Sequence, residues 1–223
     1  MNDKITVKIK GLIEEMPSLI KNFDYSSYNH GPSLYFYERT NDEVKKNKNS
    51  LENLLSNDQF IELIYATLTS WGMDSRGAKM KAFDEFRKTI LDNKQKFLEL
   101  SKYRLEDIST KEMKDVENKL QNLFDNLHVM ESKSELVANS KIMHFILPDL
   151  VMPMDRTNTL QFFYENSNIY NPKAKFLEVF EASWMIAKGM IAKEMNLKSY
   201  VSEKGLYRSI PKVIDGAIIA IKK

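Results

Sequence analysis

The sequence contains no cysteine, and this absence removes several kinds of site at once. A chain without thiols forms no disulfide, holds no metal through thiolates and uses no cysteine nucleophile. Such a composition is typical of a reducing compartment, so we predict a cytoplasmic location. Histidine is also scarce, because only His30, His128 and His144 occur, without the HExxH or H-x-x-x-H spacing of a zinc site. We therefore predict no metal and no cofactor.

Glycine and long apolar runs are scarce as well. Only seven glycines occur, and the P-loop, GxGxxG and G-x-S-x-G patterns are absent from the sequence. No apolar run approaches the ~20 residues that cross a membrane. The amino-terminal MNDKITVKIK lacks the apolar core of a signal peptide, so we expect no membrane association. The net charge of +2 is too small to indicate a nucleic-acid partner by itself.

Apolar residues recur at helical spacing along nearly the whole chain. Near the amino terminus, for example, Ile5, Ile9, Leu12 and Met16 fall on one helix face. We predict an all-α, multi-helix globular fold, either as a single domain over residues 1–223 or as two lobes, about 1–110 and 111–223. The segments expected to be helical are 3–23, 32–39 (helical or extended), 51–55, 59–71, 74–79, 79–100 (one helix or two), 110–127, 132–147, a helix after residue 155, 172–195 and 212–221.

The densest apolar run, Glu131 to Tyr164, carries polar residues that packing alone does not explain. Burying a polar group without a partner is expensive, so polar residues inside an apolar segment commonly have a use. The polar residues of this run are Asn139, Ser140, Lys141, His144, Asp149 and Asp155.

The local structure of this run follows from its capping residues and prolines. Ser132 and Glu135 fit the S-x-x-E capping box, which predicts a helix start. Pro148 ends that helix at about residue 147. Lys141 lies seven residues before Pro148, on the same helix face. Asp155 precedes another helical pattern and is well placed to be its N-cap.

Each polar residue also has a purely structural explanation. Asp155 can be a helix cap and nothing more. Lys141 can lay its stem on apolar surface and keep its ammonium in water. His144, the lone histidine of the segment, can make a core hydrogen bond. If these residues instead form a site, Asp155 must lie within about two helical turns, ~11 Å, of Lys141 or His144.

The string from Ser140 to Asp155, SKxxHFxxPDxxxPxD, lies between two predicted helices. It resembles the core of the helix–hairpin–helix superfamily of base-excision DNA glycosylases, and more closely an uncharacterised all-helical family related to them. In those glycosylases an aspartate after the hairpin stabilises positive charge on the deoxyribose or activates the nucleophile. The resemblance assigns this role to Asp155, with Lys141 as a second catalytic candidate.

The resemblance also implies duplex DNA as a partner and a pocket for an extruded base. The pocket candidates are Asn139, His144 and Tyr164. Lys133 and Ser134 at the predicted hairpin, together with Arg156, are expected to contact phosphates.

A second phosphate site is suggested by the segment 74–79. Arg76 and Lys79 lie at its predicted helix start, where backbone N–H groups favour an anion. Helix capping with ordinary surface charge explains the same residues equally well.

Two departures from the glycosylase pattern set the expected chemistry. Residues 126–140 contain no glycine for a Gly-x-Gly hairpin turn. The position of the Schiff-base lysine of bifunctional members falls at Leu136 or Val137, and Lys141 lies at least a turn later. Two functions stay open: monofunctional base excision that uses Asp155, or a non-enzymatic helical binding or structural module.

Overall fold

The described part of the chain is built from helices. The computed structural model describes residues 3–23, 32–47, 50–75, 77–132, 135–168 and 172–221. Within these ranges no strand forms, and the one β-type pairing is an isolated bridge between Met80 and Met130. The all-α prediction is therefore confirmed. The elements are α1 Asp3–Asn22, α2 Pro32–Lys46, α3 Leu51–Leu54, α4 Asp58–Ser70, α5 Phe83–Asp92, α6 Lys94–Leu100, α7 Thr110–Asn126, α8 Glu135–Ile146, the π-helical turn η3 Arg156–Leu160, α9 Gln161–Tyr164, α10 Pro172–Ala192, the 3-10 turn η4 Leu197–Tyr200 and α11 Ile210–Ala220.

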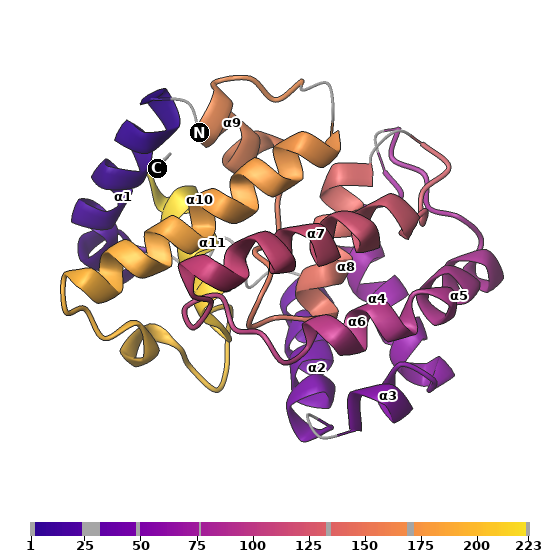
Figure 1. Cartoon of the computed structure of the whole chain (residues 1–223). Coiled ribbons are helices and arrows are strands. Elements are labelled where there is room, and N and C mark those ends of the chain that lie inside the picture. Colours follow the sequence, from indigo (N-terminus) through magenta and orange to yellow (C-terminus); the bar gives the residue numbers. More distant parts are fainter. Residues whose placement is uncertain are drawn as a thin grey trace.

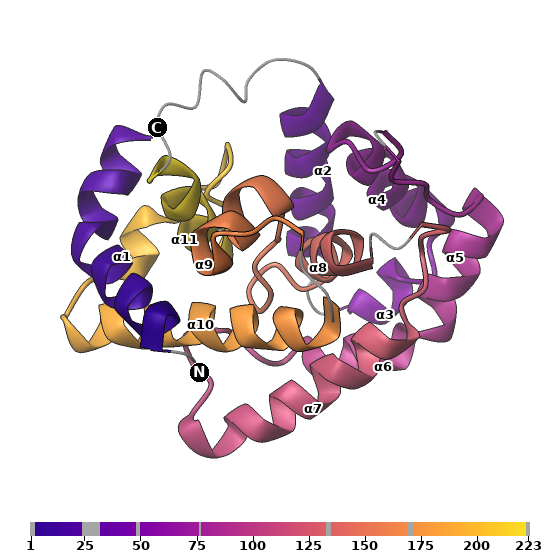
Figure 2. The same cartoon turned by 90° about the horizontal axis from the view of Figure 1, so that it is seen from above.

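Helix α8 lies at the centre of the molecule. It packs against α2 and α4 on one side and against α10 on another (Figures 1 and 2). Every residue from Ala138 to Ile146 is buried, the polar ones included. A helix buried on all sides must satisfy its polar side chains internally, so α8 sets the positions of the groups that those side chains contact.

The first helix packs with the last ones. α1 lies against α10 and α11, at the far side of the molecule from α3 and α5 (Figure 1). The approach to α10 is close at Gly189, because a Cβ atom there would lie 2.4 Å from Ile13 Cδ1. The predicted alternative of two lobes divided near residue 110 stays a prediction, and α1 joins the carboxy-terminal helices across that division.

The helix predicted at residues 74–79 is wrong. Gly72 ends α4 with a φ of +77°, and Gly77 also has a left-handed φ of +86°. The backbone then pairs with the segment before α8: Lys81 N–H donates to Val129 O at 3.0 Å, and Glu131 N–H donates to Lys79 O at 2.8 Å. Because these groups are used between segments, the next helix, α5, begins only at Phe83.

The second helix is longer than predicted, because α2 runs to Lys46 and not to 39, whereas several other boundaries lie close to the observed ones. The segment 79–100 resolves into two helices, α5 and α6. α7 begins after a capping box of Ser109 and Glu112. α10 ends at Ala192, three residues early, and Glu194 follows with a left-handed φ of 60°. Ser209 caps α11, and its side chain accepts the Lys212 N–H.

No helix in the described ranges is both long and apolar enough to span a bilayer. The predicted cytoplasmic location stays a prediction.

Candidate functional site

Lys141 of α8 and Asp155, the N-cap of η3, line one cavity. The cavity has a volume of about 300 Å³, and its wall includes Trp71 at the end of α4. α11 contributes Lys212 and Asp215 to the same wall. The structure thus gathers two ammonium groups, two carboxylates and an indole from four elements far apart in the sequence.

Asp155 is held by the turn that it caps. Its Oδ1 accepts the Asn158 N–H at 2.5 Å, and its Oδ2 accepts the Asn158 side-chain amide at 2.8 Å. Its own N–H donates to Thr159 Oγ1 at 3.1 Å. The predicted N-cap role is confirmed. Each carboxylate oxygen still has a lone pair for a further donor, so capping leaves the half-buried group able to act on a ligand.

Lys141 is a buried lysine with 7% of its surface exposed. Its Nζ donates to the carbonyl oxygen of Trp71 at 3.1 Å and lies 5.5 Å from the centre of the Trp71 ring. Burial lowers the pKa of the Lys141 ammonium to about 8, against the opposing effect of the Asp155 carboxylate. At pH 7 the side chain is therefore mainly a charged hydrogen-bond donor, with a small neutral fraction.

Lys212 and Asp215 form a buried ion pair one helical turn apart, with 2.5 Å between Nζ and Oδ2. The Lys212 ammonium also lies 5.0 Å from the Trp71 ring centre and 5.8 Å from that of Tyr37. Burial raises the pKa of the Asp215 carboxyl, while the Lys212 ammonium lowers it. Sequence reasoning missed this pair, although a Lys and an Asp at i and i+3 in the apolar string IPKVIDGAIIA are a signal that could have found it.

His144 serves the core and does not line this cavity. Burial lowers the pKa of its imidazole to about 3, so the ring is neutral. A neutral ring has one donor and one acceptor. Nδ1 donates to Val151 O at 2.8 Å, which leaves Nε2 to accept from the Tyr37 hydroxyl at 3.1 Å. With both nitrogens used, His144 has no free group to offer a ligand.

Asn139 and Tyr164 also lie outside the lining of the Lys141–Asp155 cavity. Asn139 is fully buried; its amide donates to Phe124 O at 3.4 Å, and its Oδ1 has no partner among the described residues. The Tyr164 hydroxyl donates to Glu178 Oε2 at 2.8 Å and faces a different cavity, beside Lys8 of α1. The three predicted pocket residues therefore do not share one site.

The predicted phosphate contacts are dispersed. Arg156 is exposed beside Asp155 and makes no ion pair within the described ranges. Lys79 is exposed and paired with Glu131, with 2.5 Å between Nζ and Oε2. The remaining three, Arg76, Lys133 and Ser134, lie outside the described residues.

The connection between α7 and α8 differs from a tight hairpin where it is described. The segment 129–131 pairs with 79–81, as given above. The Ser132 hydroxyl accepts the Lys79 N–H at 3.2 Å, so it takes part in the same pairing. No described group of three or more Asp, Glu or His side chains is arranged to hold a metal ion.

Comparison with known proteins returned no relative: no family model matches the chain, and neither a curated protein nor a solved structure matches it.

Proposed function

We propose that this protein binds nucleic acid and admits a single base to the Lys141–Asp155 cavity, where Asp155 assists cleavage of the glycosidic bond. The observation that carries the proposal is the meeting of a buried lysine and a fixed carboxylate at one cavity beside an indole. A nucleobase is flat and carries donors and acceptors at its edge, so a cavity with an aromatic wall and opposite charges suits it.

The proposed reaction needs two things from the protein. When the bond between the sugar and the base breaks, its electron pair leaves with the base, and positive charge develops on the sugar. The Asp155 carboxylate would stabilise that charge and accept a proton from the water that adds to the sugar. The Lys141 ammonium would donate to the departing base and offset its negative charge.

The chemistry is proposed to be monofunctional, without cleavage of the strand. A Schiff base requires a neutral amine, and the Lys141 amine is mostly protonated below pH 8. Val137 lies near the position that the nucleophilic lysine has in the bifunctional glycosylases that the chain resembles. It packs against the core and has no reactive group.

Affinity for the strand would come from phosphate contacts, with Arg156 as the described residue best placed to make one. It is exposed, unpaired within the described ranges and adjacent to Asp155. Lys79 is a weaker candidate, because its charge is already matched by Glu131.

A second candidate is a non-enzymatic binding module on the same scaffold. Two observations favour it: residues 129–131 of the connection before α8 pair with residues 79–81, and the buried charges of Lys212 and Asp215 neutralise each other. Such a cavity would hold a base or another small polar ring without acting on it.

The test is an assay of base release on duplexes with oxidised, alkylated or deaminated bases, for the native chain and for Asp155→Asn. Asparagine is also a good N-cap, so the substitution removes the charge while the turn is kept. The matched control is Asp149→Asn, six residues earlier, which lines another cavity.

If the protein excises bases, the native chain and Asp149→Asn should both release the base. Asp155→Asn should release it at least about a hundredfold more slowly while its DNA affinity is retained. Binding without release, unchanged in Asp155→Asn, would favour the binding module. Absence of binding to any duplex at low salt would reject the nucleic-acid proposal.

A further inference from the structure

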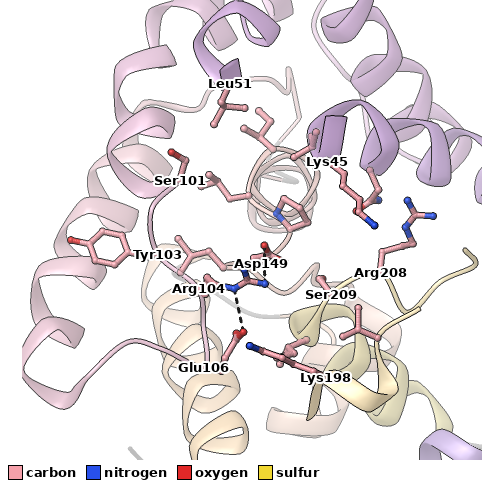
Figure 3. Close-up of a pocket in the computed structure, with 18 of the residues that line it drawn as sticks. Lys45, Leu51, Ser101, Tyr103, Arg104, Glu106, Asp149, Lys198, Arg208 and Ser209 are labelled. Carbon is pink, nitrogen blue, oxygen red and sulfur yellow. Dashed lines mark hydrogen bonds and ion pairs between the residues drawn. The ribbon is translucent and has the colours of Figure 1, made fainter. Parts of the chain in front are cut away.

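A larger cavity lies at the other end of the segment that joins α8 to η3. Its volume is about 410 Å³. Residues 101–106 form one wall, and the turn at Pro148 another. The segment 198–210 closes the opposite side, and Lys45 of α2 reaches the same space (Figure 3). Volumes of this size are typical of pockets for small molecules.

Glu106 is the unusual residue of this cavity. It is 6% exposed, and its Oε1 accepts from Arg104 Nε at 3.4 Å. Its second oxygen, Oε2, has no hydrogen-bond partner among the described residues. Burial raises the pKa of this carboxyl. Because buried polar atoms in native proteins nearly always have a partner, we expect this oxygen to accept from a donor outside the described residues, either water or a ligand.

One partly exposed side chain, that of Arg104, lies against Glu106. Arg104 contacts both carboxylates at this end, Glu106 and Asp149, the latter with 3.3 Å between Nη2 and Oδ2. The Arg104 side chain is 41% exposed, so it can rotate outward without disturbing the core. Such a rotation exposes Glu106 to a ligand and leaves Arg104 available for an anionic group.

A free cation lies at the same end of the cavity. Lys198 is exposed and has no ion-pair partner within the described ranges, and Figure 3 draws its ammonium and Glu106 at the lower end of the cavity. Two further cations that line the cavity already have ion-pair partners: Lys45 pairs with Glu203 at 3.0 Å, and Arg208 pairs with Asp42. A carboxylate and an ammonium are thus both available within one pocket.

The remaining wall is apolar. Leu51, drawn at the upper end in Figure 3, lines the cavity together with Ile146, Leu147 and Leu150. An apolar group at that end would gain about 25 cal/mol for each Å² removed from water.

We propose that this cavity binds a small zwitterion with an apolar body, of the class of the apolar α-amino acids. Its ammonium donates to Glu106, its carboxylate contacts Lys198, and its side chain extends toward Leu51. The two charged groups of an α-amino acid are bonded to one carbon, which fits a pocket where the partnerless Oε2 of Glu106 and the unpaired Lys198 ammonium lie at one end. This proposal is independent of Asp155 and of nucleic-acid binding.

The test is calorimetric titration of the full chain with L-leucine, L-methionine and L-phenylalanine, and with N-acetyl-L-leucine and L-leucinamide. The acetyl group removes the ammonium, and the amide removes the carboxylate. Each modified ligand is expected to bind at least about tenfold more weakly than leucine, the difference that one charged hydrogen bond makes.

Two substitutions assign the contacts. Glu106→Gln should weaken leucine about tenfold and leave N-acetyl-L-leucine unaffected, whereas Lys198→Met should weaken leucine and leave L-leucinamide unaffected. Asp155→Asn, in the other cavity, should change none of these affinities. Glu106→Gln should also raise the melting temperature without ligand, since it removes a buried charge that lacks a full set of partners.

Several results would overturn the proposal. If no apolar amino acid gives binding heat at either of two temperatures, the proposal is rejected. Equal affinity for leucine and its acetyl derivative would exclude the Glu106 contact. Should Glu106→Gln fail to fold, Lys198→Met tests the same ligand with a surface substitution, and unchanged leucine binding there would reject the assigned orientation.

Discussion

Lys141 and His144 lie three residues apart on α8, yet they belong to different parts of the molecule. Both are basic, both are buried, and burial lowers the pKa of both side chains. His144 is enclosed by Tyr37 and Val151, which use both of its nitrogens. Lys141 lines a cavity with Asp155, and among the described residues its ammonium donates to one acceptor, the Trp71 carbonyl.

The difference teaches how to read a polar residue in an apolar helix. The sequence around each residue is equally apolar, so burial alone does not separate a core residue from a site residue. The two cases differ in the partners that other segments supply. A hydroxyl and a carbonyl use both nitrogens of the histidine, whereas the lysine lies beside a carboxylate and an open cavity. Substitutions at three positions test this distinction.

The largest effect is expected at His144. His144→Leu leaves the Tyr37 hydroxyl and the Val151 carbonyl buried without partners, so it should lower the free energy of unfolding by about 2–5 kcal/mol. Urea denaturation measures the change. His128→Leu is the matched control, because the exposed His128 makes only a surface contact with Glu135, and it should unfold nearly as the native chain does. Equal midpoints for the two variants would show that the buried hydrogen bonds of His144 do not stabilise the fold.

A smaller effect of opposite sign is expected at Lys141. Because the folded-state pKa, about 8, lies below the unfolded value of ~10.4, the unfolded chain binds more protons between these pH values. The charged lysine therefore destabilises the fold below pH 8, and the penalty disappears as the pH rises toward 10. Lys141→Met should raise the free energy of unfolding at pH 7 by on the order of 1–3 kcal/mol.

The difference between Lys141→Met and the native chain should shrink between pH 8 and pH 10, which denaturation at several pH values would measure. Lys79→Met, at an exposed lysine paired with Glu131, controls for loss of a positive charge and should show no such pH dependence. A destabilised Lys141→Met at pH 7 would mean that the hydrogen bond to Trp71 and the attraction of Asp155 outweigh burial.

The smallest effect separates the two roles of Asp155. Asp155→Ala removes the cap of η3 and should lower the free energy of unfolding by about 1 kcal/mol, whereas Asp155→Asn should lower it by a few tenths. Thermal denaturation compares the two. If both variants lose base release while only the alanine variant loses stability, the carboxylate acts on the substrate and does not merely hold the turn.

The sequence predicted much of the fold because helices are encoded locally. Pro148 at the end of α8 and Asp155 at the start of η3 both act within a few residues. The wrong helix at 74–79 has a non-local cause, since the backbone of Lys79 and Lys81 pairs with residues far along the chain. No local pattern contains that information.

The candidate site also contains residues that the sequence could nominate and residues that only the fold reveals. Asp155 and Lys141 could be nominated because they interrupt an apolar run. Lys212, Asp215 and Trp71 come to the cavity from α11 and α4, because α11 packs against η3 and α4 packs against α8. Tyr164 fails as a pocket residue for the same reason: α9 directs it toward α10, where Glu178 accepts its hydroxyl.

The central claim, that a base enters the Lys141–Asp155 cavity, is tested most directly by the fluorescence of Trp71. The chain has two tryptophans, so Trp184→Phe leaves Trp71 as the single tryptophan, which is excited selectively at wavelengths that tyrosine does not absorb. Titration with a duplex that contains a damaged base should change the Trp71 emission in step with binding, because the base lies against the wall that the indole forms. Saturable binding of the same duplex with unchanged Trp71 emission would contradict the account.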